Sequence, residues 1–400
     1  MRLRIGMAAF VAVALAALAA PMALANYVYW PNLAGSTIGR MALDGGQLDN
    51  SFIPTQNTGL DELTSVAVDT RYVYWAHTNN VGVGGIGRAK LDGSDVQPNF
   101  IPPSAGVVDP IGLAVTATHI YWASDDGNGL GRADLDGANV NPEFVSGLSA
   151  PCGLAADANF LYFTDYPGGN FAVARVPIGG GTPDEDFIPV TAGGDCGVAV
   201  DTSHVYWSES APSPFTGSGV GRANLDGSGV DHAFIGPAGI SAAGVAVTPQ
   251  YVFWGGAFTS HFVGRAGIDG TAADNHFAAA GTDDAASPYL LAASPSNSFT
   301  LGKAKLHKRK GTATISATVP GPGTLVASGS SKKKTLKPAQ TTAGAPGTLK
   351  LKIRAKGKAA RSLRRKGRAK LKLGITYTPQ GVAGIPSLQA TRVVLKRRSR

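Results

Sequence analysis

Carboxylate and imidazole side chains gather in two kinds of short segment of this 400-residue chain. The first kind follows a pair of aromatic residues and includes "ASDDGNG" and "TDYPGGNFA", and the second precedes short apolar stretches such as "CGVAV". The residues that we single out are Asp61, His77, Asp125, Asp126, Asp165, Asp195, Glu209 and His261. If the fold brings them to one face, they form an acidic rim suited to a cation or a basic ligand.

No catalytic or metal-binding signature accompanies these residues. The stretch "DDGNG" at 125–129 lacks the alternating acidic positions and the terminal glutamate of a calcium loop. The chain also has no G-x-S-x-G elbow that would support a Ser-His-Asp arrangement. We therefore assign no catalytic residue, no metal ligand and no cofactor from the sequence.

The two cysteines occupy the same place in two similar phrases. Cys152 lies in "PCGLAAD" and Cys196 in "DCGVAVD", 44 residues further on. A disulfide is chemically allowed in an exported protein and requires Cα atoms within about 7 Å. Neighbouring strands can meet this requirement, but two free buried thiols remain the alternative.

These residues are set in a repeat. Aromatic pairs such as "YVYW" and "HIYW" recur at intervals of 41 to 47 residues. The pairs end at Trp30, Trp75, Trp122, Phe163, Trp207 and Trp254. A period of this size predicts a solenoid or a propeller.

Each period contains four strand-like segments in a constant order. An apolar segment is followed by the aromatic one, a segment with Gly-Arg or Ala-Arg, and a segment around "FIP". Asp-Gly, as in "LDGS", separates the last two and predicts a type I′ hairpin turn. Four antiparallel strands make one propeller blade. Because the first aromatic segment has no apolar one before it, we expect "YLLAAS" at 289–294 to complete that blade and close a ring of six.

One arginine per period accounts for most of the basic residues in this part of the chain. These arginines are Arg40, Arg88, Arg132, Arg175, Arg222 and Arg265. A ligand site does not need the same arginine six times around a ring, so we expect a structural role. The guanidinium groups should lie between sheets and donate to carbonyl oxygens, or to carboxylates such as Asp69, Asp157 or Asp201.

The motifs "YW", "G-R-A-N-L-D-G" and "G-[LV]-A-V-D", in this order, resemble the YWTD repeat, also called the low-density-lipoprotein-receptor class B repeat. The resemblance covers about residues 26–294 and implies a six-bladed β-propeller. Only "YFTD" at 162–165 keeps the aspartate of the family motif, as Asp165. Lactonases, streptogramin lyases and NHL-like propellers have overlapping patterns.

The beginning of the chain predicts export. Arg2 and Arg4 precede an uncharged apolar run that ends in small residues, which is typical of a secretory signal peptide cleaved after Ala25. An uncleaved membrane anchor is the alternative. No later stretch is long and apolar enough to predict a transmembrane helix.

Charge divides the chain sharply. From Leu301 onward there are 26 of the 36 Lys and Arg residues and none of the 27 Asp and Glu residues. Alternating segments such as "TLKLKIRAK" predict strands of a β-sandwich that resembles the Ig-like modules of secreted bacterial proteins. We expect this module to bind anionic polymers of a cell envelope, or to dock on its own acidic propeller. Aromatic residues are almost absent, so sequence-specific nucleic-acid binding is not expected.

The sequence thus predicts an all-β protein with a signal peptide at 1–25, a six-bladed propeller at 26–295 and a basic sandwich at 296–400. We expect a secreted or envelope-associated, non-catalytic binding protein, whose variable loops meet a protein, peptide or glycan ligand. A hydrolase or lyase with a site at the propeller axis is the alternative. The sandwich would hold the protein near anionic polymer.

Overall fold

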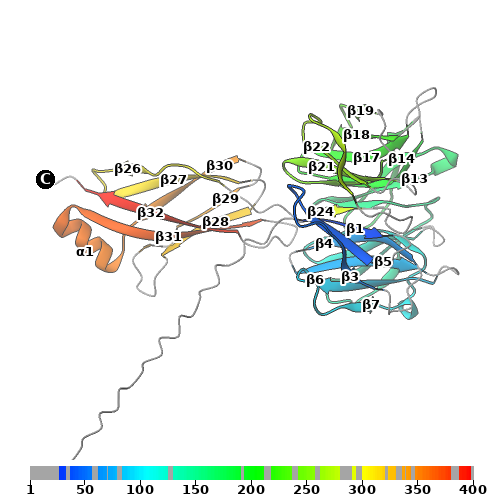
Figure 1. Cartoon of the computed structure of the whole chain (residues 1–400), viewed down its shortest axis with the longest axis horizontal. Helices are drawn as coiled ribbons and strands as arrows, with labels where there is room; N and C mark the ends of the chain where they lie inside the picture. Colours follow the sequence, from blue (N-terminus) through cyan, green and yellow to red (C-terminus); the bar gives the residue numbers. More distant parts are fainter. Residues whose placement is uncertain are drawn as a thin grey trace, which may run out of the picture.

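The computed structural model describes residues 27–32, 37–55, 62–69, 71–78, 83–124, 129–190, 193–210, 218–236, 242–256, 262–279, 291–293, 300–319, 323–329, 336–337, 339–343, 347–379 and 387–397. The predicted signal peptide lies outside these residues, as do Asp61, Asp125, Asp126 and His261. The described chain is almost entirely strand, arranged in eight four-stranded sheets. Figure 1 shows the sheets of the N-terminal part gathered together and the two C-terminal sheets as a separate group. The six N-terminal sheets form a ring through contacts between their innermost strands.

The six sheets of the ring are antiparallel, and each is read here from the innermost strand outward. The first contains β24 (Ala292–Ala293), β1 (Tyr27–Asn32), β2 (Thr37–Ala42) and β3 (Asp49–Pro54). The second contains β4 (Glu62–Val68), β5 (Tyr72–Thr78), β6 (Gly85–Lys90) and β7 (Gln97–Ile101). The third contains β8 (Pro110–Val115), β9 (His119–Ser124), β10 (Gly129–Asp134) and β11 (Asn141–Ser146).

The remaining three sheets follow the same order. The fourth contains β12 (Leu154–Ala156), β13 (Phe160–Asp165), β14 (Ala172–Pro177) and β15 (Asp184–Pro189). The fifth contains β16 (Gly194–Val200), β17 (His204–Ser210), β18 (Ser218–Asn224) and β19 (Asp231–Ile235). The sixth contains β20 (Ala242–Val247), β21 (Tyr251–Gly256), β22 (Phe262–Gly267) and β23 (Asp274–Ala279). This confirms the predicted six-bladed propeller.

The ring closes as the sequence predicts. The late strand β24 pairs antiparallel with the first strand β1, placing Ala293 opposite Val28 and Ala292 opposite Tyr29. Consecutive innermost strands contact one another around the ring, and β24 contacts both β20 and β4. The first sheet is therefore completed by residues that lie more than 250 positions away in the chain.

The aromatic pairs form the core between sheets, and they explain the glycine before each repeated arginine. Trp122, for example, is fully buried and lies directly opposite Gly131 on the neighbouring strand. A Cβ on Gly131 would clash with the indole ring. In the fourth sheet the aromatic residue is the smaller Phe163, and an alanine, Ala174, stands opposite it. The Gly-Arg motif therefore follows from the size of the aromatic residue across the strand pair.

The repeated arginines stack on aromatic rings of their own sheets, and four of the six also bond to the next sheet. Each guanidinium carbon lies 3.5 to 4.3 Å from the centre of a phenylalanine ring on the outermost strand of its own sheet. Four of them also donate to the carbonyl oxygen of a leucine in the hairpin of the next sheet. These pairs are Arg40 with Leu91 (3.2 Å), Arg88 with Leu135 (3.4 Å), Arg175 with Leu225 (3.2 Å) and Arg265 with Leu43 (2.9 Å).

The three aspartates named as possible partners accept other donors, whereas Arg175 pairs with a different carboxylate, that of Asp184, at 3.3 Å. Asp69 accepts the backbone N–H groups of Arg71 (2.6 Å) and Tyr72 (2.7 Å) and the hydroxyl of Tyr74 (3.2 Å). Asp157 and Asp201 repeat this pattern in their own sheets. The side chain of an aspartate at the start of a tight turn is short and accepts the nearby backbone N–H groups of that turn. It therefore bonds to these groups rather than to a guanidinium group further away.

The Asp-Gly hairpins also differ from the prediction. Gly93 has a φ of +84°, but Asp92 before it is not among the residues with positive φ. A type I′ turn requires positive φ at both central residues. Instead, the Asp92 carboxylate accepts the backbone N–H of Ser94 (3.0 Å), and Gly93 donates to the Lys90 carbonyl (2.8 Å). The aspartate thus stabilises the turn through its side chain, and the glycine alone takes the left-handed conformation.

The C-terminal residues form two further four-stranded sheets. In one, β27 (Thr312–Val319) pairs with β25 (Thr300–Leu301), β26 (Lys305–His307) and β30 (Gly347–Arg354). The other has the order β29 (Ala339–Ala343), β28 (Gly323–Gly329), β31 (Arg368–Pro379) and β32 (Ser387–Lys396). One helix, α1 (Gly357–Lys366), connects β30 to β31. Buried residues of both sheets and of α1 share one apolar core, which includes Ile315, Leu351, Leu371 and Leu363. This is the predicted β-sandwich.

Candidate functional site

Polar side chains recur at one position of the ring, two residues after the last aromatic residue of each second strand. The position is occupied by Asn32, His77, Ser124, Asp165, Glu209 and Gly256. The five polar side chains are all buried. Three of our eight candidates belong to this set and therefore lie on three different sheets. They occupy equivalent positions around the ring, in the second, fourth and fifth sheets.

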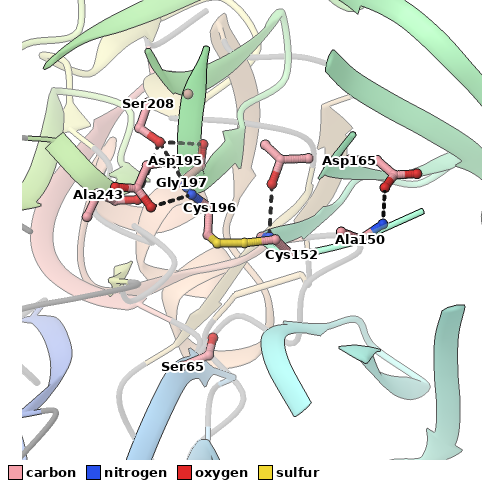
Figure 2. Close-up of a disulfide and its surroundings, with 12 residues drawn as sticks. Ser65, Ala150, Cys152, Asp165, Asp195, Cys196, Gly197, Ser208 and Ala243 are labelled. Atoms are coloured by element: carbon pink, nitrogen blue, oxygen red, sulfur yellow. Dashed lines mark hydrogen bonds between the residues drawn. A yellow bond between two sulfur atoms is a disulfide. The ribbon is translucent and has the colours of Figure 1, made fainter. Parts of the chain in front are cut away.

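Asp165 organises a loop. Its side chain is fully buried, and its Oδ1 accepts the backbone N–H groups of Ala150 (2.6 Å) and Tyr166 (2.8 Å). Its Oδ2 accepts the N–H of Ser149 at 3.3 Å. Figure 2 shows the Asp165–Ala150 bond near Cys152. The carboxylate thus stabilises the turn that leads into β12.

Glu209 is buried against two donors that the sequence did not link to it. It accepts the indole N–H of Trp207 at 2.9 Å, and its Oε1 lies 2.8 Å from Nδ1 of His232. Burial raises the pKa of Glu209, and the bonds to His232 and Trp207 oppose this effect. His232 comes from the outermost strand β19 and is partly exposed. No repeat pattern pointed to this residue, because the pairing depends on how β17 and β19 lie in one sheet.

His77 is buried as a neutral ring. Its exposed fraction is only 3 %. Burial lowers the pKa of His77 from its usual 6.5 to about 4. Among the described residues, its Nε2 atom has no hydrogen-bond partner. The corresponding Asn32 is held by bonds from its Nδ2 to the carbonyl of Asn50 and to the hydroxyl of Thr37, both at 2.7 Å. Ser124 donates to the carbonyl of Val108.

Asp195 is the candidate that remains partly exposed, and it lies beside an exposed aromatic ring. Its Oδ1 accepts the backbone N–H of Cys196 at 3.0 Å. Tyr166 donates its hydroxyl to the carbonyl of Gly194 (3.2 Å), and 40 % of its surface is exposed. Burial, and secondarily the charge of Asp195, raise the pKa of Tyr166. Tyr166 also packs edge-on against Phe171, with ring centres 5.1 Å apart. The sequence offered no signal for Tyr166, which lies outside the repeat.

Cys152 and Cys196 form a disulfide between neighbouring sheets, with Cα atoms 5.1 Å apart (Figure 2). Cys152 lies two residues before the start of β12, and Cys196 lies in β16. The innermost strands approach so closely here that a Cβ on Gly153 would clash with the carbonyl oxygen of Cys196. Gly112 has the same relation to the carbonyl of Cys152. Small residues are therefore required where these innermost strands meet. The described strands consequently carry few functional side chains at this point of approach.

The described part of the chain contains no group of three or more His, Cys, Asp or Glu residues placed to hold a metal ion. Within the same residues, no helix is long and apolar enough to cross a membrane. The arrangement around Asp165, Glu209 and His77 can hold loops and strand ends in place. The exposed surface around Tyr166 and Asp195 combines an aromatic ring with a carboxylate, which is suited to contact with another molecule.

Comparison with known proteins supports the architecture. No protein-family model and no curated protein matches the chain in sequence. Among solved structures, the chain is similar to one in a crystal structure of a nidogen/laminin complex, with a TM-score of 0.54 and 16 % identity over 67 % of this chain and 98 % of that chain. It is also similar to TolB from Acinetobacter baumannii, with a TM-score of 0.48 and 14 % identity over 68 % of this chain and 67 % of that chain. Together with the ring of six sheets, the first likeness shows that residues 27–293 form a β-propeller.

Proposed function

We propose that this protein is an exported, non-catalytic binding protein of a bacterial cell envelope. Its YWTD-type propeller presents a loop face to a protein, peptide or glycan ligand. Its Ig-like C-terminal module binds anionic polymers of the envelope. The observation that carries this proposal is the segregation of charge, because every Asp and Glu residue precedes the sandwich and 26 Lys and Arg residues lie within it.

The surroundings of Asp165, Glu209 and His77 support a binding role for the propeller. Asp165 and Glu209 accept bonds from groups within the fold, and His77 is buried as a neutral ring. A general acid or base must reach the reacting group of a substrate. Buried groups of this kind stabilise loops, and the loops then present exposed residues such as Tyr166. The similar chain of the nidogen/laminin complex also comes from an assembly of proteins.

The composition of the sandwich supports polyanion binding. No ion pair can form within this module between an acidic and a basic side chain, because it has no acidic side chain. The charges are neutralised only by mobile ions or by a partner. A multivalent anion gains affinity by releasing the counterions of both molecules, and this gain falls steeply as salt rises.

Sedimentation with purified bacterial cell walls tests this proposal. We expect the mature protein to sediment with the walls at low ionic strength. It should be released as the screening length falls from about 10 Å at 0.1 M salt to about 3 Å at 1 M salt. Walls stripped of their phosphate polymers serve as the control and should retain much less protein. Failure to sediment at low salt, or equal retention by stripped walls, would refute the proposed role of the module.

A further inference from the structure

Five cationic side chains share the outer face of strands β31 and β32. Along β31, Leu371 and Leu373 point into the core, and the alternate residues point outward. On β32, Val393 and Leu395 point into the core, and the residues that alternate with them point outward. The outward residues that form this basic face are Arg368, Lys370, Lys372, Arg392 and Lys396.

The strand register places like charges directly opposite each other. Lys372 pairs with Arg392 and Arg368 pairs with Lys396 across the two antiparallel strands. Side chains at such positions have Cβ atoms only about 5 Å apart, and like charges there destabilise the sheet. Since the module contains no carboxylate, nothing within it offsets this repulsion.

Protection of a sheet edge does not account for the whole basic face. Lysine and arginine on an edge strand prevent pairing with other chains, and β32 is the edge of its sheet. β31 pairs with β32 along residues 368–377 but with β28 only from Leu373 onward, so Lys370 and Lys372 also lie beyond the end of β28. An edge protected by cations does not, however, need like charges placed directly opposite each other, as Lys372 and Arg392 are. A bound anion that lies between the two strands would relieve the repulsion.

The chemistry of the face indicates the kind of anion. Arginine binds phosphate in a bidentate manner, and lysine binds it as a point charge. The outward residue opposite Lys370 is Val394, and the aromatic side chain of β31, Tyr377, is fully buried. The basic face thus lacks the aromatic rings on which nucleic-acid bases stack. Successive outward residues on one strand are about 7 Å apart, so the face offers a row of charges to an extended chain.

We propose that the basic face of β31 and β32 binds a linear, base-free phosphate polymer of the polyol-phosphate type. Its phosphate groups lie between the opposed cations and neutralise both cross-strand pairs. This inference rests on the proposed polyanion-binding function and assigns it to one of the two sheets.

One substitution separates binding from stability. Lys372→Glu in the full mature protein places a carboxylate opposite Arg392 and converts repulsion into an ion pair. We expect the sandwich to become more resistant to thermal unfolding. We expect affinity for a synthetic poly(glycerol phosphate) oligomer, measured by titration calorimetry at low salt, to fall at least about tenfold because phosphate contacts are lost.

Lys352→Glu is the matched control. Lys352 is exposed on β30 of the other sheet and stands opposite Thr314, so the same change of charge creates no cross-strand ion pair. We expect its affinity for the oligomer to change less than about threefold, since only the long-range potential is altered. Lys372→Arg should keep binding near that of the unchanged protein.

The outcomes distinguish this inference from the proposed function. Equal losses in the two glutamate variants, or a loss confined to Lys352→Glu, overturn the assignment to the basic face and leave polyanion binding intact. An unchanged protein that does not bind the oligomer at low salt overturns both. Tighter binding to single-stranded DNA of equal charge, or to phosphatidylglycerol vesicles, overturns the choice of a base-free polymer.

Discussion

At the residue scale, the position two residues after the last aromatic residue of each second strand holds a buried polar side chain in five sheets, but the type of side chain differs from sheet to sheet. Asn32, Asp165 and Glu209 each use their polar atoms on groups within the fold. Buried polar groups without such bonds lower stability, so each replacement must find its own local partners. For His77, burial instead lowers the pKa of the ring.

His77 should make the stability of the propeller depend on pH. The pKa of His77 is lowered from 6.5 to about 4 in the folded state, so the unfolded chain binds a proton more readily. The contribution of the neutral His77 ring to the free energy of unfolding is complete above about pH 6.5. It is lost progressively as the pH falls toward 4, by up to about 3 kcal/mol. Chemical denaturation at pH 7 and pH 4.5 measures this loss.

The variant His77→Gln carries no charge at either pH. The difference in unfolding free energy between pH 7 and pH 4.5 should therefore shrink in this variant, even if its absolute stability is lower. An equal difference in both proteins would mean that His77 does not contribute to the acid sensitivity.

At the scale of the element, the blade is shaped by pairs of residues across the second and third strands. A tryptophan on the second strand covers a glycine on the third, and where the aromatic residue is Phe163 the opposing residue is Ala174. The packing of protein interiors is dense enough that one extra methyl group must displace its neighbours. The repeat therefore conserves the combined volume of the two residues in each pair.

Gly131→Ala should destabilise the protein by about 1 to 3 kcal/mol, because its Cβ clashes with the indole ring of Trp122. Trp122→Phe should also be destabilising on its own, because it removes buried apolar surface. The double variant reproduces the Phe163–Ala174 pair, so its cost should be smaller than the sum of the two single costs. A double-mutant cycle by urea denaturation measures this coupling, and strict additivity would contradict it.

The packing of neighbouring strands also explains the disulfide. Cys152 and Cys196 stand at equivalent positions of the repeat, before β12 and within β16, where glycines allow the backbones to approach each other. Two residues that repeat at the period of the fold become neighbours whenever consecutive repeats pack side by side. The bond joins the fourth and fifth sheets close to the strands that surround the axis.

At the scale of the whole molecule, the ring depends on contacts between the two ends of the propeller. Within the described residues, the short strand β24 pairs with β1 at Val28–Ala293 and Tyr29–Ala292. Arg265 of the sixth sheet donates to the carbonyl of Leu43 in the first sheet at 2.9 Å and stacks on Phe277. This contact spans 222 positions of sequence and reinforces the closure of the ring.

Arg265→Ala should lower the unfolding free energy by about 2 to 3 kcal/mol, because it removes a charge-assisted hydrogen bond and a stacked cation. Arg88→Ala removes the equivalent contacts between the second and third sheets, where the bond to Leu135 is longer at 3.4 Å. The Arg265 variant should therefore also unfold faster than the Arg88 variant. Stopped-flow unfolding in urea compares the two rates, and a faster Arg88 variant would contradict the role of the closure.

The repeat in the sequence was sufficient to predict the propeller, the number of sheets and the strand that closes the ring. Each of these follows from short-range patterns, since a period of 41 to 47 residues and an unpartnered aromatic strand can be read along the chain. The charge of the C-terminal module and its alternating strands could be predicted for the same reason. For four of the six repeated arginines, the expected bond to a carbonyl oxygen of the next sheet is present.

The partners of individual side chains were decided only by the tertiary structure. Asp69 satisfies its own turn and the Tyr74 hydroxyl, His232 reaches Glu209 from another strand, and Tyr166 lies beside Asp195. The register of β31 and β32, which opposes Lys372 to Arg392, is likewise invisible in the sequence of either strand. Hydrophobic periodicity specifies which face of a strand is buried, whereas hydrogen bonds and opposed charges depend on distances between segments that only the folded chain brings together.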